Sequence, residues 1–233
     1  MKFGIIGAME EEISKLESLM DIKRHKKIGG MNFRQGLLEG IEIVLVHSGI
    51  GKVNAALCAH TLINNFRVDY VLFSGVAGAL SPHLDIGDIV ISSDSMYHDV
   101  DVTVSGYPVG QIPRLAVRAF PAETELIHRA RMAAEEAVPQ RVFIGRVLTG
   151  DRFVANKMEA RRLGNELAGV CVEMEGAGVG QACYINKTPY VLIRCISDRA
   201  DGTAAGDFKQ FCRQAADTAA GIICGVLRRF RVN

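Results

Sequence analysis

Residues 2–20 read KFGIIGAMEEEISKLESLM, and this stretch contains the repeating unit of the fold. The run Lys2–Ile6 predicts a buried strand, because it is short and largely apolar. Gly7 ends the strand, and the following segment Glu10–Met20 has the apolar spacing of a helix. A strand, a glycine turn and a helix in this order are typical of α/β proteins.

The same alternation continues through the chain and predicts an α/β fold. Further strands are expected at Glu42–His47, Tyr70–Ser74, Asp88–Ser92, Val142–Leu148, Gly169–Val172 and Tyr190–Ile196. Further helices are expected at Val53–Asn65, Ala122–Ala137, Lys157–Glu166, Gly176–Ile185 and Asp207–Phe230. The last helix places one apolar stripe on Phe208, Phe211, Ala215, Ile222, Val226 and Phe230. The region Tyr97–Pro121 has no clear period and three prolines, so we expect a long and functional loop there.

Composition limits the class of partner. The 233 residues are 48% hydrophobic and 23% charged, as expected for one globular domain spanning residues 1–233. With 27 basic and 26 acidic side chains the formal net charge is +1, so we expect no binding to nucleic acid or to a membrane. We also expect no signal peptide, no membrane-spanning run and reduced, buried cysteines. These features predict a cytoplasmic protein with a small-molecule ligand.

Ligands of open α/β sheets bind beyond the carboxyl ends of the strands, so the residues that follow each strand are the candidates for a site. Glycines and carboxylates dominate these positions. They form the clusters Gly7–Glu12, Ser48–Lys52, Ser74–Gly78, Gly150–Val154 and Val172–Glu175, together with Ile196–Asp198.

Each acidic cluster has a structural and a catalytic interpretation. Three glutamates from Glu10 to Glu12 stabilise a helix N-terminus, but one of them could serve as a general base. Glu173 and Glu175 suit either a capped helix or a carboxylate that accepts hydrogen bonds from a vicinal diol. Asp198 follows a strand that is almost entirely apolar, where a carboxyl group can be buried and act as an acid.

Other chemistries lack their motifs. Gly49-Ile50-Gly51-Lys52 does not have the spacing of a Walker loop, and no Gly-x-Gly-x-x-Gly opens a βαβ unit. His98, Asp99 and Asp101 have no partner at a metal-binding spacing, so no metal site is expected. A Gly-x-Ser-x-Gly nucleophile is also missing.

Taken together, the clusters resemble those of a known family. The motifs are GIIGAMEEE at 4–12, SGIGKV at 48–53, GVAG at 75–78, YHD at 97–99 with DVT at 101–103, VEME at 172–175 and RCISD at 194–198. They occur in this order in bacterial 5′-methylthioadenosine/S-adenosylhomocysteine nucleosidases. The resemblance implies a single three-layer αβα domain of the nucleoside phosphorylase type, with a central mixed, mostly parallel twisted sheet. It also implies a cytoplasmic homodimer with no cofactor and no metal.

The resemblance further implies hydrolysis of the N-glycosidic bond of 5′-methylthioadenosine and S-adenosylhomocysteine, with 5′-deoxyadenosine as a further substrate. Such cleavage passes through an oxocarbenium-like sugar and requires an acid on the leaving group and a base on water. By matching position, Asp198 would protonate adenine with Ser197 orienting it, and Glu12 would deprotonate water. Glu175 would hold the ribose hydroxyls.

The same matching assigns the binding residues. Phe153 would stack on the purine, and Val154, Val76, Ala77 and Gly78 would line the same end of the site. Met174 would lie against the ribose. The set is completed by Glu173 and Arg194, by Met9, Ile50 and Phe208 around the thioether arm, and by Val102, Tyr107 and Pro113 from the neighbouring subunit. Ser105 stands where many relatives carry an aromatic residue, so the preferred 5′-substituent stays open.

Three alternatives compete with this interpretation. A purine nucleoside phosphorylase would need cations to hold phosphate, whereas Glu10–Glu12 would repel a dianion, so hydrolysis is favoured. An aminodeoxyfutalosine nucleosidase would keep the same chemistry on another 5′-arm. A non-catalytic purine sensor would need neither Glu12 nor Asp198.

Overall fold

The computed structural model describes residues 1–200 and 208–231, and it describes side chains up to residue 200 and from 214 to 231. The strands are β1 Lys2–Gly7, β2 Asp21–Ile28, β3 Met31–Leu38, β4 Ile41–His47, β5 Tyr70–Ala79, β6 Ile89–Tyr97, β7 Phe120–Pro121, β8 Val142–Thr149, β9 Gly169–Glu173 and β10 Tyr190–Asp198. The helices are α1 Glu10–Leu19, α2 Lys52–Phe66, the 3₁₀ turn η1 Thr103–Ser105, α3 Thr124–Ala137, α4 Lys157–Leu167, α5 Gly176–Asn186 and α6 Phe208–Arg231. All the predicted strands and helices are present.

The strands form one 10-stranded mixed sheet in the order β10-β6-β8-β9-β5-β1-β4-β3-β2, with β7 on β6. β10 also pairs with β5, so that β5, β10, β6, β8 and β9 close into a ring. The prediction of a mixed sheet is confirmed. Most of the paired residues lie in the parallel ladders β1–β4, β1–β5, β10–β5, β6–β8 and β8–β9, as predicted. The pairs β10–β6, β5–β9 and β6–β7 and the β2–β3–β4 meander are antiparallel.

The β2–β3 hairpin was not predicted. β2 has the sequence DIKRHKKI and lies almost fully exposed at the edge of the sheet, so it carries no apolar alternation. The turn between the two strands uses Gly29 and Gly30, which have φ angles of 56° and 85° that favour glycine. Lysines on an exposed edge strand disfavour pairing with other chains, which explains this composition.

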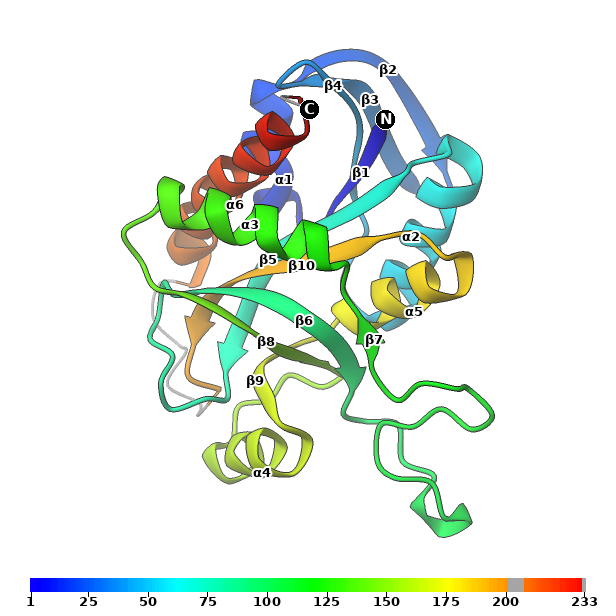
Figure 1. Ribbon diagram of the computed structural model, residues 1–233, viewed down its shortest axis with the longest axis vertical. Coiled ribbons are helices and arrows are strands. Elements are labelled where there is room, and N and C mark those ends of the chain that lie inside the picture. Colours follow the sequence, from blue (N-terminus) through cyan, green and yellow to red (C-terminus); the bar gives the residue numbers. More distant parts are fainter. Residues whose placement is uncertain (201–207, 232–233) are drawn as a thin grey trace.

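Helices cover both faces of the sheet. Figure 1 shows α1, α3 and α6 on one side and α2 with α5 on the other, which gives the expected three layers. Ala215, Ile222 and Val226 of the predicted α6 stripe are buried, and Phe230 packs against Phe3 and Tyr70. The side chains of Phe208 and Phe211 lie outside the described residues. The free thiols of Cys58, Cys171, Cys183 and Cys224 are buried in the apolar core.

The expected long loop is also present. Apart from η1, the segment 98–119, which we call the protruding segment, has no regular structure and extends away from the sheet (Figure 1). Val104, in the η1 turn of this segment, is 98% exposed.

Candidate active site

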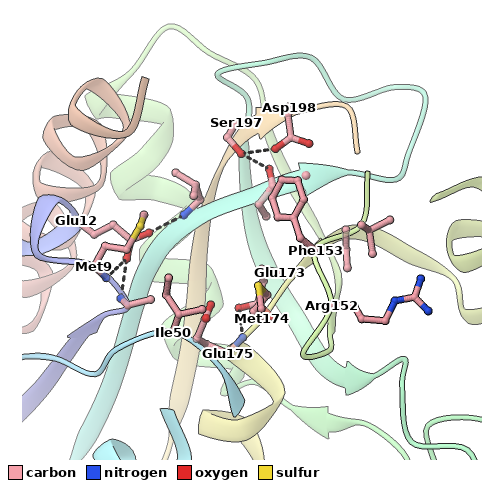
Figure 2. Close-up of a pocket in the computed structure, with 16 residues that line it drawn as sticks. Met9, Glu12, Ile50, Arg152, Phe153, Glu173, Met174, Glu175, Ser197 and Asp198 are labelled. Atoms are coloured by element: carbon pink, nitrogen blue, oxygen red, sulfur yellow. Dashed lines mark hydrogen bonds between the residues drawn. The ribbon is translucent and has the colours of Figure 1, made fainter. Parts of the chain in front are cut away.

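A cavity of about 240 Å³ opens where β1, β5, β9 and β10 end (Figure 2). Most of the predicted site residues line it, namely Met9, Glu12, Ile50, Val76, Ala77, Gly78, Phe153, Val154, Glu173, Met174, Glu175, Ser197 and Asp198. The fold therefore brings residues from six separate stretches of sequence into one space.

Glu12 is held at the start of α1 by three backbone amides. Its Oε2 accepts hydrogen bonds from the amides of Ala8 at 2.6 Å and Met9 at 3.0 Å, and its Oε1 accepts one from the amide of Val76 at 3.2 Å. A Cβ atom on Gly75 would lie 2.9 Å from Oε1, so a larger residue at this position would displace the carboxylate. Burial raises the pKa of Glu12, while the charge of Arg194 and the three amides oppose this shift. Such a buried carboxylate facing a cavity can accept a proton from water.

Only one of the three consecutive glutamates faces the cavity. Glu10 and Glu11 are exposed, and Glu10 instead lies 2.8 Å from Nη2 of Arg34. Adjacent residues of a helix point about 100° apart, which explains this separation of Glu12 from its neighbours.

Asp198 reaches the cavity through an irregularity at the end of β10. The register with β5 shifts between Ile196 and Asp198, which lets Ser197 and Asp198 both turn to the cavity. The Ser197 hydroxyl lies 2.7 Å from Oδ2 of Asp198, and the Ala200 amide donates to Oδ1 at 2.7 Å. On the neighbouring strand, a Cβ on Gly78 would lie 3.0 Å from the same Oδ1. Asp198 is thus fixed in place beside open space.

The structure separates the two glutamates of the Glu173–Glu175 cluster, and the predicted capped helix is formed with Glu173. Glu173 accepts hydrogen bonds from the amides of Glu175 at 3.1 Å and Gly176 at 2.7 Å, from the Thr149 hydroxyl, and from Nη2 of Arg194 at 2.9 Å. Its oxygens are therefore occupied at the start of α5, although it borders the cavity.

Glu175 points into the cavity instead. Its Oε1 accepts a hydrogen bond from the amide of Gly51 at 2.8 Å. Burial, together with the nearby charge of Glu173, raises the pKa of Glu175 to about 8. Hydrogen-bond donors or positive charge on a ligand would therefore favour the ionised form of this carboxyl group.

Arg194 lies behind the site rather than in its wall. Its side chain is 1% exposed and is not among the residues that line the cavity. Besides Glu173, it donates to the carbonyl oxygen of Phe73 at 3.0 Å and stacks over the Phe73 ring at 4.1 Å. Its charge lowers the pKa of both Glu12 and Glu175, against the larger effect of burial. A direct contact with a ligand, as the family resemblance suggested, is therefore not supported by this placement.

The mouth of the cavity is apolar and open. Phe153 is 62% exposed and Ile50 is 55% exposed, whereas Val154 is buried deeper. Among the described residues that line the cavity, Arg152 is the one cation, and it pairs with Glu159 at 2.6 Å, directed away from the carboxylates (Figure 2). Val102, Tyr107 and Pro113 lie on the protruding segment and do not line this cavity, and the Phe208 side chain lies outside the described residues.

Sequence reasoning did not assign Ala8, Arg152 and Val172, which also line the cavity. Each of the three is next in sequence to a residue that was assigned, so their place in the same clusters could have identified them. The structure also assigns a role to the backbone amide of Gly51, which no side-chain motif could reveal.

Comparison with known proteins identifies the family. Residues 2–228 match the family model described as the phosphorylase superfamily. A 5′-methylthioadenosine/S-adenosylhomocysteine nucleosidase from Geobacillus thermodenitrificans (strain NG80-2) is 41% identical, covering 97% of this chain and 96% of that protein. The chain belongs to this nucleosidase family.

Solved structures agree with this assignment. The nucleosidase resembles a 5′-methylthioadenosine/S-adenosylhomocysteine nucleosidase from Colwellia psychrerythraea 34H in complex with adenine, with a TM-score of 0.92, 39% identity and coverage of 97% and 94% of the two chains. A futalosine hydrolase mutant of Helicobacter pylori strain 26695 has a TM-score of 0.92, 34% identity and coverage of 98% and 99%.

Within residues 1–200 and 208–231, no helix is both long and apolar enough to cross a bilayer. Among the residues whose side chains are described, 1–200 and 214–231, no group of three or more potential ligands could hold a metal ion.

Proposed function

We propose that this nucleosidase hydrolyses the N-glycosidic bond of 5′-methylthioadenosine and S-adenosylhomocysteine, releasing adenine and the thioribose. The observation that carries the proposal is a single cavity bordered by four buried carboxyl groups. Glu173 is occupied at the start of α5, whereas Glu12, Glu175 and Asp198 are each held by different partners. Glycoside hydrolysis needs an acid and a base on separate groups, and a third carboxylate can stabilise a cationic sugar.

In the proposed reaction the bond between the sugar carbon and the adenine nitrogen breaks, and its electron pair moves into the base. The Asp198 carboxyl group delivers a proton to a ring nitrogen of adenine, with the Ser197 hydroxyl fixing its orientation. A water molecule adds to the sugar carbon, and Glu12 accepts the proton that this water loses. Atoms and charges balance without a cofactor.

Glu175 would hold the ribose. One carboxylate can accept hydrogen bonds from two vicinal hydroxyls, and its negative charge favours an oxocarbenium-like sugar. Burial disfavours the ionised form of Glu175 in the free protein. Hydroxyl donors and positive charge on the bound sugar would favour that ionised form.

Apolar side chains would enclose the remaining parts of the substrate. Phe153 would stack on the purine, with Val154, Val76, Ala77 and Gly78 beside it, and Met174 would lie against the sugar. The thioether arm would lie between Met9 and Ile50, with Phe208 as a further contact by analogy with the family. Because Ile50 is exposed at the mouth of the cavity, a long 5′-substituent could extend past it toward solvent.

We further propose that the protein is a cytoplasmic homodimer. The protruding segment bears Val102, Tyr107 and Pro113, which would reach the open cavity of a second copy. In addition, the apolar side chains of Val53, Leu57 and Ile185 are exposed on α2 and α5. A mass in solution equal to that of one chain, measured by light scattering, would contradict the dimer.

Hydrolysis is favoured over phosphorolysis. Four carboxyl groups line the cavity, and the one lining cation among the described residues pairs with Glu159, so this lining offers a phosphate dianion no unpaired positive charge. A futalosine-type arm fits the same chemistry, but no contact in the cavity favours it over a thioether.

Incubation with methylthioadenosine, with and without phosphate, tests the proposal. We expect adenine and free methylthioribose at the same rate in both buffers. Sugar 1-phosphate that forms only with phosphate would indicate a phosphorylase, and tight adenine binding without turnover would indicate a sensor. Faster cleavage of aminodeoxyfutalosine than of methylthioadenosine would reassign the substrate.

A further inference from the structure

Three charged residues from distant parts of the chain meet beside the cavity. Lys52 begins α2, Asp99 lies two residues after β6, and Asp151 lies two residues after β8. The Lys52 Nζ atom lies 2.6 Å from Oδ2 of Asp99 and 3.5 Å from Oδ2 of Asp151. The amide of Asp151 also donates to Oδ2 of Asp99 at 2.9 Å. We call these three residues the Lys52 network.

The start of α2 holds two carboxylates on successive amides. The amide of Gly51 donates to Oε1 of Glu175 at 2.8 Å, and the amide of Lys52 donates to Oδ1 of Asp151 at 3.0 Å. Gly51 has a φ of 99°, a conformation that L side chains rarely adopt. One turn of backbone therefore fixes the ribose-facing carboxylate and the Lys52 network together.

Asp151 belongs to the loop that carries the base-facing residues. Phe153 and Val154 follow it directly and line the cavity. On the other side of this loop, Gly150 packs on the buried His98 ring so closely that a Cβ would lie 2.3 Å from Nε2. The position of the loop therefore depends on Asp151 on one side and on ring packing on the other.

The charges in the Lys52 network favour this arrangement. One ammonium group faces two carboxylates, and it also lies 5.4 Å from the centre of the Tyr97 ring. Burial would raise the pKa of Asp99, but hydrogen bonds from Lys52 and from the Asp151 amide lower it on balance. Lys52 and Asp99 are only about one-fifth exposed, so solvent screens their pairing less than that of a surface pair.

We propose that Asp151 is a positioning residue that fixes the loop 150–154 against the start of α2. It thereby holds Phe153 and Val154 at a set position relative to Glu175. The inference rests on the proposed function, since it takes adenine as the base. It adds that the base-binding loop is tied to the protruding segment, because Asp99 lies at the root of that segment.

Adenine binding by the full-length protein, measured by calorimetry, tests the role of Asp151. Asp151→Ala removes the acceptor for the Lys52 amide, and we expect adenine affinity to fall about tenfold, as for one lost charge-assisted hydrogen bond. Asp151→Asn keeps an oxygen for this amide and should restore affinity to within about threefold of the natural protein. Asp21→Ala, which removes an exposed pair with Lys23, is the matched control and should bind adenine normally.

Unchanged adenine affinity of folded Asp151→Ala would overturn the inference, even if its thermal midpoint fell, because a purely structural role predicts that combination. If Asp151→Ala does not fold, Lys52→Met replaces it. This variant keeps the backbone amide but leaves two carboxylates facing each other, and it should also weaken adenine binding. Failure of the unaltered protein to bind adenine would instead refute the proposed function itself.

Discussion

The substitution Glu12→Gln tests the assignment of the water-activating group. It preserves size and shape but replaces a carboxylate by an amide that cannot accept a proton at the pH of the reaction. Activity should fall while the cavity stays intact. Because burial raises the pKa of Glu12, the unaltered enzyme should also lose activity as the pH falls toward that pKa, at a pH above 4.5. The variant should lack this acidic limb.

The magnitude follows from the contacts of Glu12. A glutamine oxygen can keep the hydrogen bonds from Ala8 and Met9, but its amide group would face the N–H of Val76, so one charge-assisted hydrogen bond is lost. That loss costs about 1.5–3 kcal/mol, partly offset because no buried charge remains, so the fold should survive. A general base contributes about 10²- to 10⁴-fold, equivalent to about 3–5 kcal/mol of activation free energy.

The assay is release of adenine from methylthioadenosine, followed together with adenine affinity and the thermal midpoint. Glu11→Gln is the matched control, because Glu11 is the exposed neighbour of Glu12 in the same helical turn. We expect near-native kcat for Glu11→Gln and near-native adenine affinity for both variants. A kcat for Glu12→Gln within about tenfold of the unaltered enzyme would refute the assignment of Glu12 as base.

Three further predictions concern other parts of the molecule. Asp198→Asn removes the proposed proton donor, so adenine release should fall by about 10²-fold or more, and near-native turnover would exclude Asp198 from the mechanism. The pKa of Glu175 is raised from 4.5 to about 8, so its protonated form favours the fold. The resulting stabilisation is complete below about pH 4.5 and is lost as the pH rises through about 8. Scanning calorimetry of the ligand-free protein should show this decline in the thermal midpoint. The decline should be smaller in Glu175→Gln. Gly178→Ala places a Cβ 2.6 Å from the carbonyl oxygen of Lys52, so its free energy of unfolding, measured in urea, should fall by about 1–3 kcal/mol. Gly221→Ala is the control, because its Cβ has no neighbour nearer than 3.9 Å and should not destabilise the protein. Equal stability of the two glycine variants would argue against the close α2–α5 packing.

Local patterns were sufficient to predict most of the elements. The apolar run before Gly7 and the helical spacing after it gave the strand and helix that the structure contains at Lys2–Gly7 and Glu10–Leu19. Such patterns report burial, and the edge strand β2 is exposed, so the hairpin escaped prediction. The pairing of β10 with both β5 and β6 joins segments about 100 residues apart, and no local pattern encodes that choice.

The site divides in the same way. The sequence alone placed Glu12, Glu175 and Asp198 at strand ends, and their family motifs indicated acid, base and ribose-holding chemistry. Only the tertiary structure decided that Glu173 caps α5 while Glu175 faces the cavity, because the two differ in which donors surround them rather than in their type. It likewise placed Arg194 behind the wall of the cavity. The order of residues determines which groups lie at the ends of strands, but the direction of each side chain depends on hydrogen bonds to backbone that arrives from elsewhere in the chain.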